Sequence, residues 1–320
     1  MNRISRTALV VIATAALSTG TAHAADVTLG LSSVGLSFPF AAAIAKGFQD
    51  EAAKRGAKAV VLDAKADVQK QANDIDDLIT QKVSGIVLMP LDSVVAQGWV
   101  DRATVAGIPV VAVGSQVGDP KKRAIKDVYP KLTALTTQDE IAAGNAAGQV
   151  ALNLMPKDRP AKIAIIEGAA GFAEVAQRTD GFKQALDNAH VKYEIVASQP
   201  GDWTAEKGEA ACQNILAAHP DVDIFYNQAD DMVVGCGRAV RAAGSGAKLI
   251  GIGGSKLAVA AIKAGQVDGT VCYKPEALGA LAFDTLYDSV TGETSHKAEF
   301  LTYPTPGVTK ANIDQCVGQW

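Results

Sequence analysis

Short apolar runs rich in valine and isoleucine alternate with longer stretches of helical period from Val27 onward. Such runs, bounded by turn signals, are typical of parallel strands that are buried on both faces of a sheet. The stretches between them repeat apolar residues three and four positions apart, as an amphipathic helix requires. The alternation therefore predicts an α/β protein with doubly wound parallel sheets.

The predicted elements form two series. The first has strands, expected to be buried on both faces, at 27–31, 59–62, 85–88 and 109–113, with helices at 40–55, 68–82 and 93–106. A segment rich in Pro, Lys and Asp, 118–132, is expected to be a surface excursion. The second series has strands at 133–136, 162–167, 193–197, 224–227, 248–252 and 269–272, with helices at 139–154, 174–189, 205–218, 230–243, 256–264 and 275–290. A chain of 320 residues exceeds the usual size of one core, so two lobes are predicted.

The first residues have the pattern of an export signal. Arg3 and Arg6 form a basic region, residues 8–17 are apolar, and Ala22-His23-Ala24 fits the site that signal peptidase cleaves. The apolar run is too short to span a membrane, and the expected cleavage site has no Cys that could carry a lipid. We therefore expect residues 1–24 to be a signal peptide and the mature protein to be free in the periplasm.

Composition excludes two classes of protein. Hydrophobic residues make up 48% of the chain and charged residues 20%, so intrinsic disorder is excluded. The net charge is -4, and no stretch collects enough Lys or Arg to follow a nucleic-acid backbone. No nucleic-acid partner is expected.

The cysteines are consistent with disulfides in an oxidising compartment. All of them, Cys212, Cys236, Cys272 and Cys316, lie in the second half of the chain. The sequence allows three pairings, and four buried free thiols are the alternative. Cys212 and Cys236 lie in consecutive predicted helices that flank one strand, so we favour Cys212–Cys236 together with Cys272–Cys316. No C-x-x-C spacing occurs and no His lies close to a Cys, so no zinc site is predicted.

Aromatic residues follow several predicted strands, at the sheet edge where ligands of α/β proteins bind. Phe38 and Phe40 follow the first strand, Trp203 follows the strand at 193–197, and Tyr273 follows the strand at 269–272. Ring faces stack on sugars and on other rings, so a site for a small solute is predicted here.

Catalytic and cofactor patterns are not found. His190, His219 and His296 have no partner pattern of a nucleophile or a carboxylate, and no known catalytic motif occurs. The glycine-rich segment 251–256 lacks the order of a phosphate loop and is predicted to be a tight turn. No cofactor, metal or enzymatic activity is expected. Asp230 and Asp231 are expected to complement a helix dipole.

Several strings along the chain resemble the ribose-type periplasmic binding proteins, which are solute receptors of ABC importers. The resemblance covers nearly all of the mature chain and rests on Phe38-Pro39-Phe40, Met89-Pro90-Leu91-Asp92-Ser93, Gly107-Ile108-Pro109-Val110, Arg178-Thr179-Asp180-Gly181-Phe182 and Asp230-Asp231-Met232-Val233. It implies two Rossmann-like lobes joined by crossings near 137–138, 273–274 and 303–306. Lobe one would be 25–137 plus 274–303, and lobe two 138–273 plus 304–320.

The resemblance also implies a function. Two hinged lobes would close over a small solute, and the closed form, expected to be a monomer, would deliver it to an ABC permease in the inner membrane. A periplasmic sensor subunit, which presents its solute to a membrane kinase or chemoreceptor, is the alternative.

Comparison with the family's pocket, residue by residue, indicates a changed solute. The stacking rings match Phe40 and Trp203, but Met89 replaces an expected Asn, Gly114-Ser115 an expected Asp-Arg pair, and Tyr273 an expected Gln. The pocket should therefore suit a sugar- or polyol-like solute that is less hydroxylated or more apolar than ribose. A cation held by the rings is a second possibility, with Glu167 and Glu174 as candidate carboxylates. Arg178 is expected to be structural. The residues expected to contact the solute are Ser33, Phe38, Phe40, Met89, Ser115, Gln138, Trp203, Gln228 and Tyr273.

Overall fold

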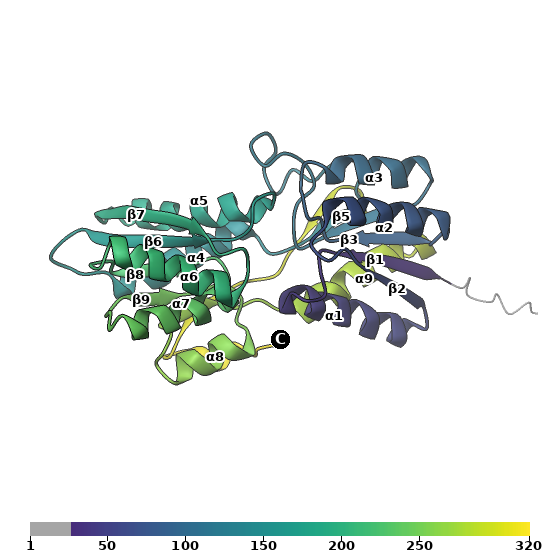
Figure 1. Cartoon of the computed structure of the whole chain (residues 1–320). Helices are drawn as coiled ribbons and strands as arrows, with labels where there is room; N and C mark the ends of the chain where they lie inside the picture. Colours follow the sequence, from purple (N-terminus) through teal and green to yellow (C-terminus); the bar gives the residue numbers. More distant parts are fainter. Residues whose placement is uncertain (1–26) are drawn as a thin grey trace, which may run out of the picture.

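The computed structural model describes residues 27–320, so the predicted signal peptide lies outside the described residues. Two α/β lobes lie side by side, each built on a six-stranded sheet with helices on both faces (Figure 1). The predicted fold class is confirmed. Among residues 27–320, no helix is long and apolar enough to span a membrane.

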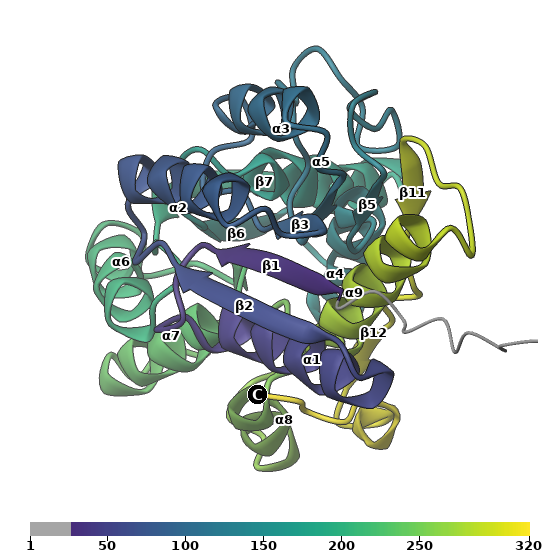
Figure 2. The ribbon, with the colours of Figure 1, turned by 90° about the vertical axis from the view of Figure 1, so that its right-hand side faces the viewer.

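The first lobe contains the sheet with strand order β11-β5-β4-β3-β1-β2, in which every pair is parallel. Its strands are β1 (Thr28–Ser33), β2 (Lys58–Asp63), β3 (Gly85–Leu88), β4 (Val110–Val113), β5 (Ala134–Thr136) and β11 (Glu299–Leu301). Its helices are α1 (Pro39–Arg55), α2 (Val68–Thr80), α3 (Ala96–Val105) and α9 (Pro275–Thr291), with α1 and α9 packed side by side (Figure 2).

Alternation along each central strand divides this core in two. Val87 and Val111 pack in the core cluster of α1 and α9, whereas their neighbours Ile86 and Val110 pack in the cluster of α2 and α3. Successive side chains of a strand point to opposite faces, so an uninterrupted apolar run serves both layers.

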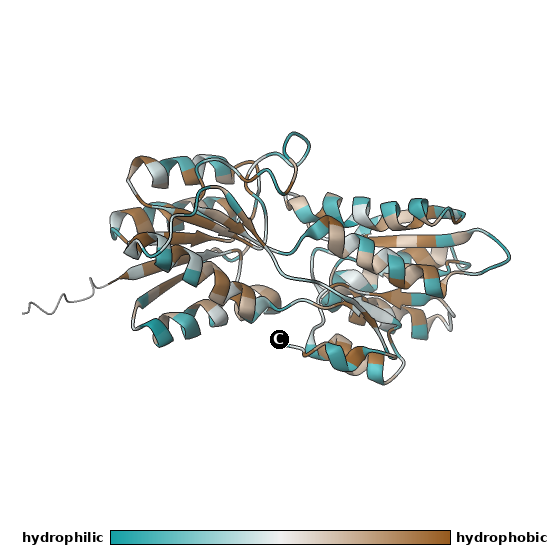
Figure 3. Ribbon diagram, turned by 180° about the vertical axis from the view of Figure 1, so that it is seen from behind, coloured by the Kyte–Doolittle hydropathy of each residue, from teal (hydrophilic) through white to brown (hydrophobic). Residues whose placement is uncertain are grey.

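The second lobe contains the sheet with order β12-β10-β9-β8-β6-β7, in which only β12 is antiparallel to its neighbour. Its strands are β6 (Ala161–Glu167), β7 (Tyr193–Pro200), β8 (Ile224–Asn227), β9 (Lys248–Ile250), β10 (Gly269–Val271) and β12 (Gly307–Thr309). Its helices are α4 (Glu140–Leu154), α5 (Ala173–Asn188), α6 (Ala205–Ala218), α7 (Asp230–Ala242), α8 (Lys256–Lys263) and the 3₁₀ turn η1 (Ile313–Gln315). In both lobes the strands are predominantly hydrophobic and the polar residues lie mainly on the helices and loops (Figure 3).

The chain passes between the two sheets after β5, after β10 and after β11. The strands of the first sheet all fall within 25–137 and 274–303, and those of the second within 138–273 and 304–320. The exact residues at which the lobes divide stay a prediction.

The structure corrects four details of the sequence analysis. β2 is only half-buried, because it lies at the edge of its sheet. The helix predicted from residue 93 begins at Ala96, because the Asp92 carboxylate accepts hydrogen bonds from the amides of Val94 and Val95 in a preceding turn. The segment 118–132 is not only superficial, since Ile125 and Val128 are buried against the core of α2 and α3. The short strands β11 and β12 were not predicted.

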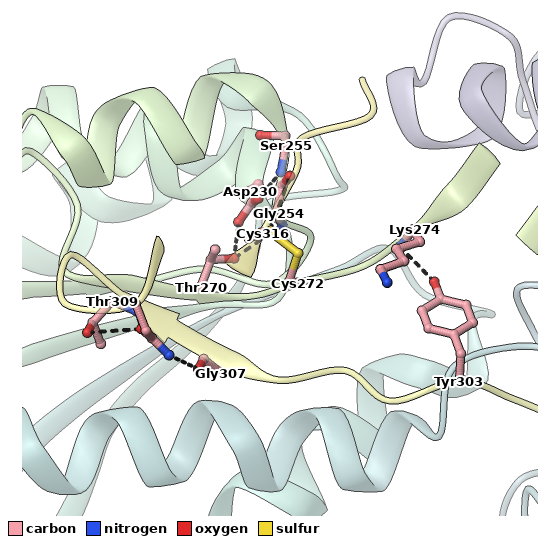
Figure 4. Close-up of a disulfide and its surroundings, with 11 residues drawn as sticks. Asp230, Gly254, Ser255, Thr270, Cys272, Lys274, Tyr303, Gly307, Thr309 and Cys316 are labelled. Atoms are coloured by element: carbon pink, nitrogen blue, oxygen red, sulfur yellow. Dashed lines mark hydrogen bonds between the residues drawn. A yellow bond between two sulfur atoms is a disulfide. The ribbon is translucent and has the colours of Figure 1, made fainter. Parts of the chain in front are cut away.

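Both favoured disulfides are present. Cys212–Cys236 joins α6 to α7 over a Cα–Cα distance of 5.3 Å, and Cys272–Cys316 joins the residue after β10 to the C-terminal segment over 5.7 Å (Figure 4). The predicted pairing is confirmed, and the alternative of four free thiols is wrong.

The second disulfide holds a tail, residues 316–320, against the hinge region. The carbonyl of Trp320 accepts a hydrogen bond from the Lys256 amide in the second lobe, at 2.8 Å. The Gln319 side chain accepts one from the amide of Glu276 in α9 of the first lobe, at 2.9 Å. The tail therefore contacts both lobes.

The glycine-rich segment 251–256 forms a strand-to-helix turn. Gly253 and Gly254 have φ values of 147° and 69°, which side chains rarely adopt. The Asp230 carboxylate accepts hydrogen bonds from the Ser255 amide and the Thr270 hydroxyl, both at 2.6 Å (Figure 4). Asp230 thus has a structural role, and its burial raises its pKa to about 6.

Candidate functional site

A cavity opens between the lobes, at the edge where the parallel strands of both sheets end. Its volume is about 90 Å³. One wall comes from the segment after β1 and the residue after β3, and the other from the segments that follow β6, β7 and β8. The lining residues are Val34, Phe38, Pro39, Phe40, Ala41 and Met89 of the first lobe and Phe172, Glu174, Arg178, Trp203, Ala229 and Asp231 of the second.

Four aromatic rings from two lobes line this cavity. Phe38 and Phe40 flank Pro39, the first residue of α1, where proline's fixed φ suits the start of a helix. Opposite them, the rings of Phe172 and Trp203 meet edge to face at 5.6 Å. Ring faces in such a cleft suit the apolar side of a small ring or chain.

Trp203 is held by an unusual local backbone. Asp202 and Trp203 both have positive φ, 46° and 65°, in the loop between β7 and α6. The indole lies on Gly168, where a Cβ atom would overlap the ring. The absence of a side chain at Gly168 therefore makes room for the indole in the cavity wall.

A buried ion pair supports the second-lobe wall. The guanidinium of Arg178 donates to both carboxylate oxygens of Glu140, at 2.7 and 3.2 Å, and to the carbonyl of Gln228 at 2.6 Å. Tyr273 adds a hydroxyl donor to Glu140 at 2.7 Å. Burial disfavours the charged guanidinium, but the attraction of Glu140 holds the pKa of Arg178 well above its usual range. The positive charge is thus permanent and is balanced by Glu140.

Two further carboxylates line the cavity. Glu174, at the start of α5, accepts a hydrogen bond from the Ser115 hydroxyl at 2.7 Å. Burial raises the pKa of Glu174 to about 7, although Arg178 acts in the opposite direction. Burial also raises the pKa of Asp231, at the start of α7.

The lobes touch directly beside the cavity. Ser115 belongs to the first lobe and Glu174 to the second, so their hydrogen bond crosses the interface. Gln177 donates to the Gln116 side chain across the same edge. The amide of Ser93 donates to the carbonyl of Gly171 at 3.2 Å. These contacts link the ends of β3 and β4 to the start of α5.

The structure divides the predicted site residues into two groups. Phe38, Phe40, Met89 and Trp203 line the cavity. The other five, Ser33, Ser115, Gln138, Gln228 and Tyr273, are buried and are not among the residues that line it. Solute contact by the nine residues stays a prediction, and the cavity supports it for the first group.

Most of the second group make hydrogen bonds within the protein. The Gln138 amide donates to the Tyr303 hydroxyl at 2.8 Å, in the hinge region. The Gln228 side chain accepts from the Gly168 amide at 3.0 Å and donates to the Val175 carbonyl at 2.8 Å. Ser33 has a buried hydroxyl with no hydrogen-bond partner among the described residues. Gln228 therefore orients the segment after β6, which forms part of the wall, and Gln138 joins two segments of the hinge region.

Sequence reasoning missed part of the cavity wall. Phe172 lies in the segment after β6, which was predicted as the strand at 162–167, and its ring was a detectable signal. Arg178 and Asp231, expected only to be structural, also line the cavity. Of the two candidate carboxylates, Glu174 lines it, whereas Glu167 accepts a hydrogen bond from Ser198 of the neighbouring strand.

Comparison with known proteins gives consistent matches over most of the chain. The family model described as "Periplasmic binding protein domain" matches residues 29–294. The ribose import binding protein of Bacillus subtilis is 31% identical over 272 residues, covering 85% of this chain and 84% of that protein. The ribose import binding protein of Escherichia coli is 30% identical over 292 residues, covering 91% and 94%.

Solved structures show the same architecture. An ABC transporter solute-binding protein from Mycobacterium smegmatis with bound glycerol has a TM-score of 0.82 and 31% identity, covering 92% of this chain and 98% of that one. The Caulobacter myo-inositol-binding protein, bound to myo-inositol, has a TM-score of 0.81 and 27% identity, covering 92% and 97%.

Proposed function

Because the chain belongs to the family of periplasmic binding proteins, we propose that it captures a small organic solute between its lobes and delivers it to an ABC permease. The supporting observation is the cavity, whose two walls come from different lobes. Such a site can close by hinge motion, and closure changes the outer surface that a permease meets. The relatives are binding proteins rather than enzymes, and no catalytic role is assigned here.

The proposed solute is sugar- or polyol-like but less hydroxylated, or more apolar, than ribose. The curated relatives above are ribose import proteins, and the two structural neighbours hold glycerol and myo-inositol. In this chain nine of the twelve lining residues are apolar, and the polar ones are Glu174, Arg178 and Asp231. Each hydroxyl left unpaired in a closed site would cost about 1–3 kcal/mol, so such a wall favours a solute with few hydroxyls.

We assign direct solute contact to Phe38, Phe40, Met89 and Trp203, and a supporting role to the buried polar residues behind them. The mature protein would be exported after cleavage at residue 24 and would act in the periplasm as a monomer. We also propose that the lobes divide at the predicted boundaries and that the three chain crossings between the lobes form the hinge.

A binding screen tests the proposal. Mature protein is unfolded, dialysed and refolded to remove any retained solute, and thermal shift is measured against sugars, polyols and their deoxy and amino derivatives. We expect at least one compound to raise the melting temperature. Mass spectrometry of the protein before unfolding should detect a retained compound of the same class. If no member of the panel stabilises the protein, the proposed function is contradicted.

Trp203→Ala locates the site. Loss of a stacked indole should weaken binding of the compound found in the screen by about 1–3 kcal/mol, measured by calorimetric titration. Tyr193→Ala is the matched control, because Tyr193 lies on the outer strand β7 of the same lobe. Its hydroxyl donates a hydrogen bond to Asp187. Equal affinities of the two variants would show that Trp203 does not contact the solute.

A further inference from the structure

We propose that the cleft selects a solute that carries a protonated amine. This inference rests on the proposed function, because it specifies the class of solute for the same cleft. Its basis is the balance of charge around the cavity, together with the rings that surround it.

The cavity wall carries more negative than positive charge. Among its described lining residues, Glu174 and Asp231 are acidic and Arg178 is the one basic residue. Arg178 is already paired, since Glu140 receives two of its N–H groups and lies buried behind the wall. Glu174 and Asp231 are therefore left without a full countercharge.

These carboxylates share the cavity wall with aromatic rings; Glu174 is buried and Asp231 is half-buried. Glu174 is only 7% exposed. A cation in this cavity would also lie near the rings of Phe38, Phe40 and Phe172, and ring faces attract positive charge. An ammonium group brings three N–H donors to this wall, whereas the N–H groups of Arg178 are engaged by Glu140 and by the carbonyl of Gln228.

The ionisation of the two cleft carboxylates is consistent with a cationic solute. Burial raises the pKa of both Glu174 and Asp231. The groups that act on Glu174 are Arg178 of its own helix, Glu140 of α4 and the Ser115 hydroxyl of the facing lobe. Asp231 has Asp230 as its neighbour, whose carboxylate already accepts from Ser255 and Thr270. A bound cation would stabilise the ionised carboxylates and return these pKa values toward normal.

Matched pairs of small molecules test the inference at pH 8. Each pair has the same skeleton: 3-amino-1,2-propanediol with glycerol, and trans-2-aminocyclohexanol with trans-1,2-cyclohexanediol. Calorimetric titration of refolded protein should show that the amine of at least one pair binds ten times more tightly than its diol or triol. If the neutral members bind equally or more tightly, the inference is overturned while the proposed function gains support. If no amine binds, the inference is also overturned, and the wider screen above decides the proposed function separately.

Variants show whether the carboxylates carry the preference. Glu174→Gln and Asp231→Asn should each lower the affinity for the amine at least tenfold, and the tenfold preference for the amine over its neutral partner should disappear. Glu167→Gln is the matched control, because this acid lies outside the cavity lining and bonds to Ser198. Circular dichroism confirms folding, and Asp231→Asn decides the outcome if Glu174→Gln does not fold.

Proton release provides a readout that is independent of affinity. At pH 6.5 the wild-type protein should release protons on binding the amine, because Glu174 with a pKa of about 7 must ionise. Titration in two buffers of different ionisation enthalpy measures this release. It should shrink in Glu174→Gln and persist in Glu167→Gln. An amine that binds wild-type protein without proton release contradicts the role of Glu174.

Discussion

Glu174 shows how strongly position modifies a single side chain. Its carboxyl group lies at the start of α5, where the helix dipole favours negative charge, yet burial outweighs this effect and raises its pKa to about 7. The folded protein therefore holds a proton on Glu174 at mildly acidic pH, and the unfolded chain does not.

This difference makes stability depend on pH. As pH rises from about 4.5 to about 7, the free energy of unfolding of the ligand-free protein should decrease. In this range Glu174 is protonated in the folded protein but ionised in the unfolded chain, so a higher pH favours the unfolded chain. Glu174→Gln removes the contribution of Glu174 to this slope and should be more stable than wild type by roughly 2 kcal/mol at pH 7.5, with equal stability at pH 4. Urea denaturation across the pH range measures both proteins. Parallel stability profiles would show that Glu174 titrates normally.

At the residue scale, the sequence predicted the aromatic residues of the cavity better than its charged residues. Phe38, Phe40 and Trp203 could be placed at strand ends, because the ends of parallel strands meet at one edge. The pairing of Arg178 with Glu140 could not be predicted, because it joins two helices 38 residues apart in the chain. Without knowledge of that ion pair, the surplus negative charge of Glu174 and Asp231 cannot be inferred from the sequence.

At the scale of elements, prediction succeeded where an apolar run or a helical period marked the element and failed where neither did. β3 and β8 have the predicted bounds, and so does α6, because apolar runs and helical periods extend over their whole length. β11 and β12 have three residues each and no alternation, and they are strands only because the neighbours β5 and β10 pair with them. Such edges depend on tertiary structure.

The disulfide between α6 and α7 gives a prediction at this scale. Replacing Cys212 and Cys236 together by Ala should lower the free energy of unfolding by about 3 kcal/mol, because the unfolded chain loses a cross-link that closes a loop. The sequence separation of the two cysteines is 24 residues. Urea denaturation of the double variant and of the oxidised wild type measures the loss. A midpoint equal to that of wild type would show that the cross-link adds nothing to stability.

At the scale of the whole molecule, the lobes are joined by three crossings and by side-chain contacts beside the cleft. Ser115 and Glu174 form one of these contacts, and Gln116 and Gln177 another. Contacts of this kind are lost when the lobes separate, so they favour the closed form.

Removing one contact should shift this equilibrium. Ser115→Ala is expected to weaken binding of the solute about fivefold, since a hydrogen bond contributes about 1 kcal/mol. Small-angle scattering of the ligand-free variant should show a larger radius of gyration than wild type. Ser198→Ala is the matched control, because its hydroxyl bonds to Glu167 within the second lobe. If the two serine variants behave alike, the contact does not govern closure.

The position of Trp320 has a practical consequence. Its indole meets the ring of Phe40 edge to face at 5.5 Å, and Phe40 lines the cleft. Any polypeptide fused after Trp320 would therefore begin close to the cleft wall, where an affinity tag could occupy the cleft or hinder closure. β1 instead begins at the end of its sheet that lies away from the cleft (Figure 1), so a tag joined before Val27 would leave the cleft clear.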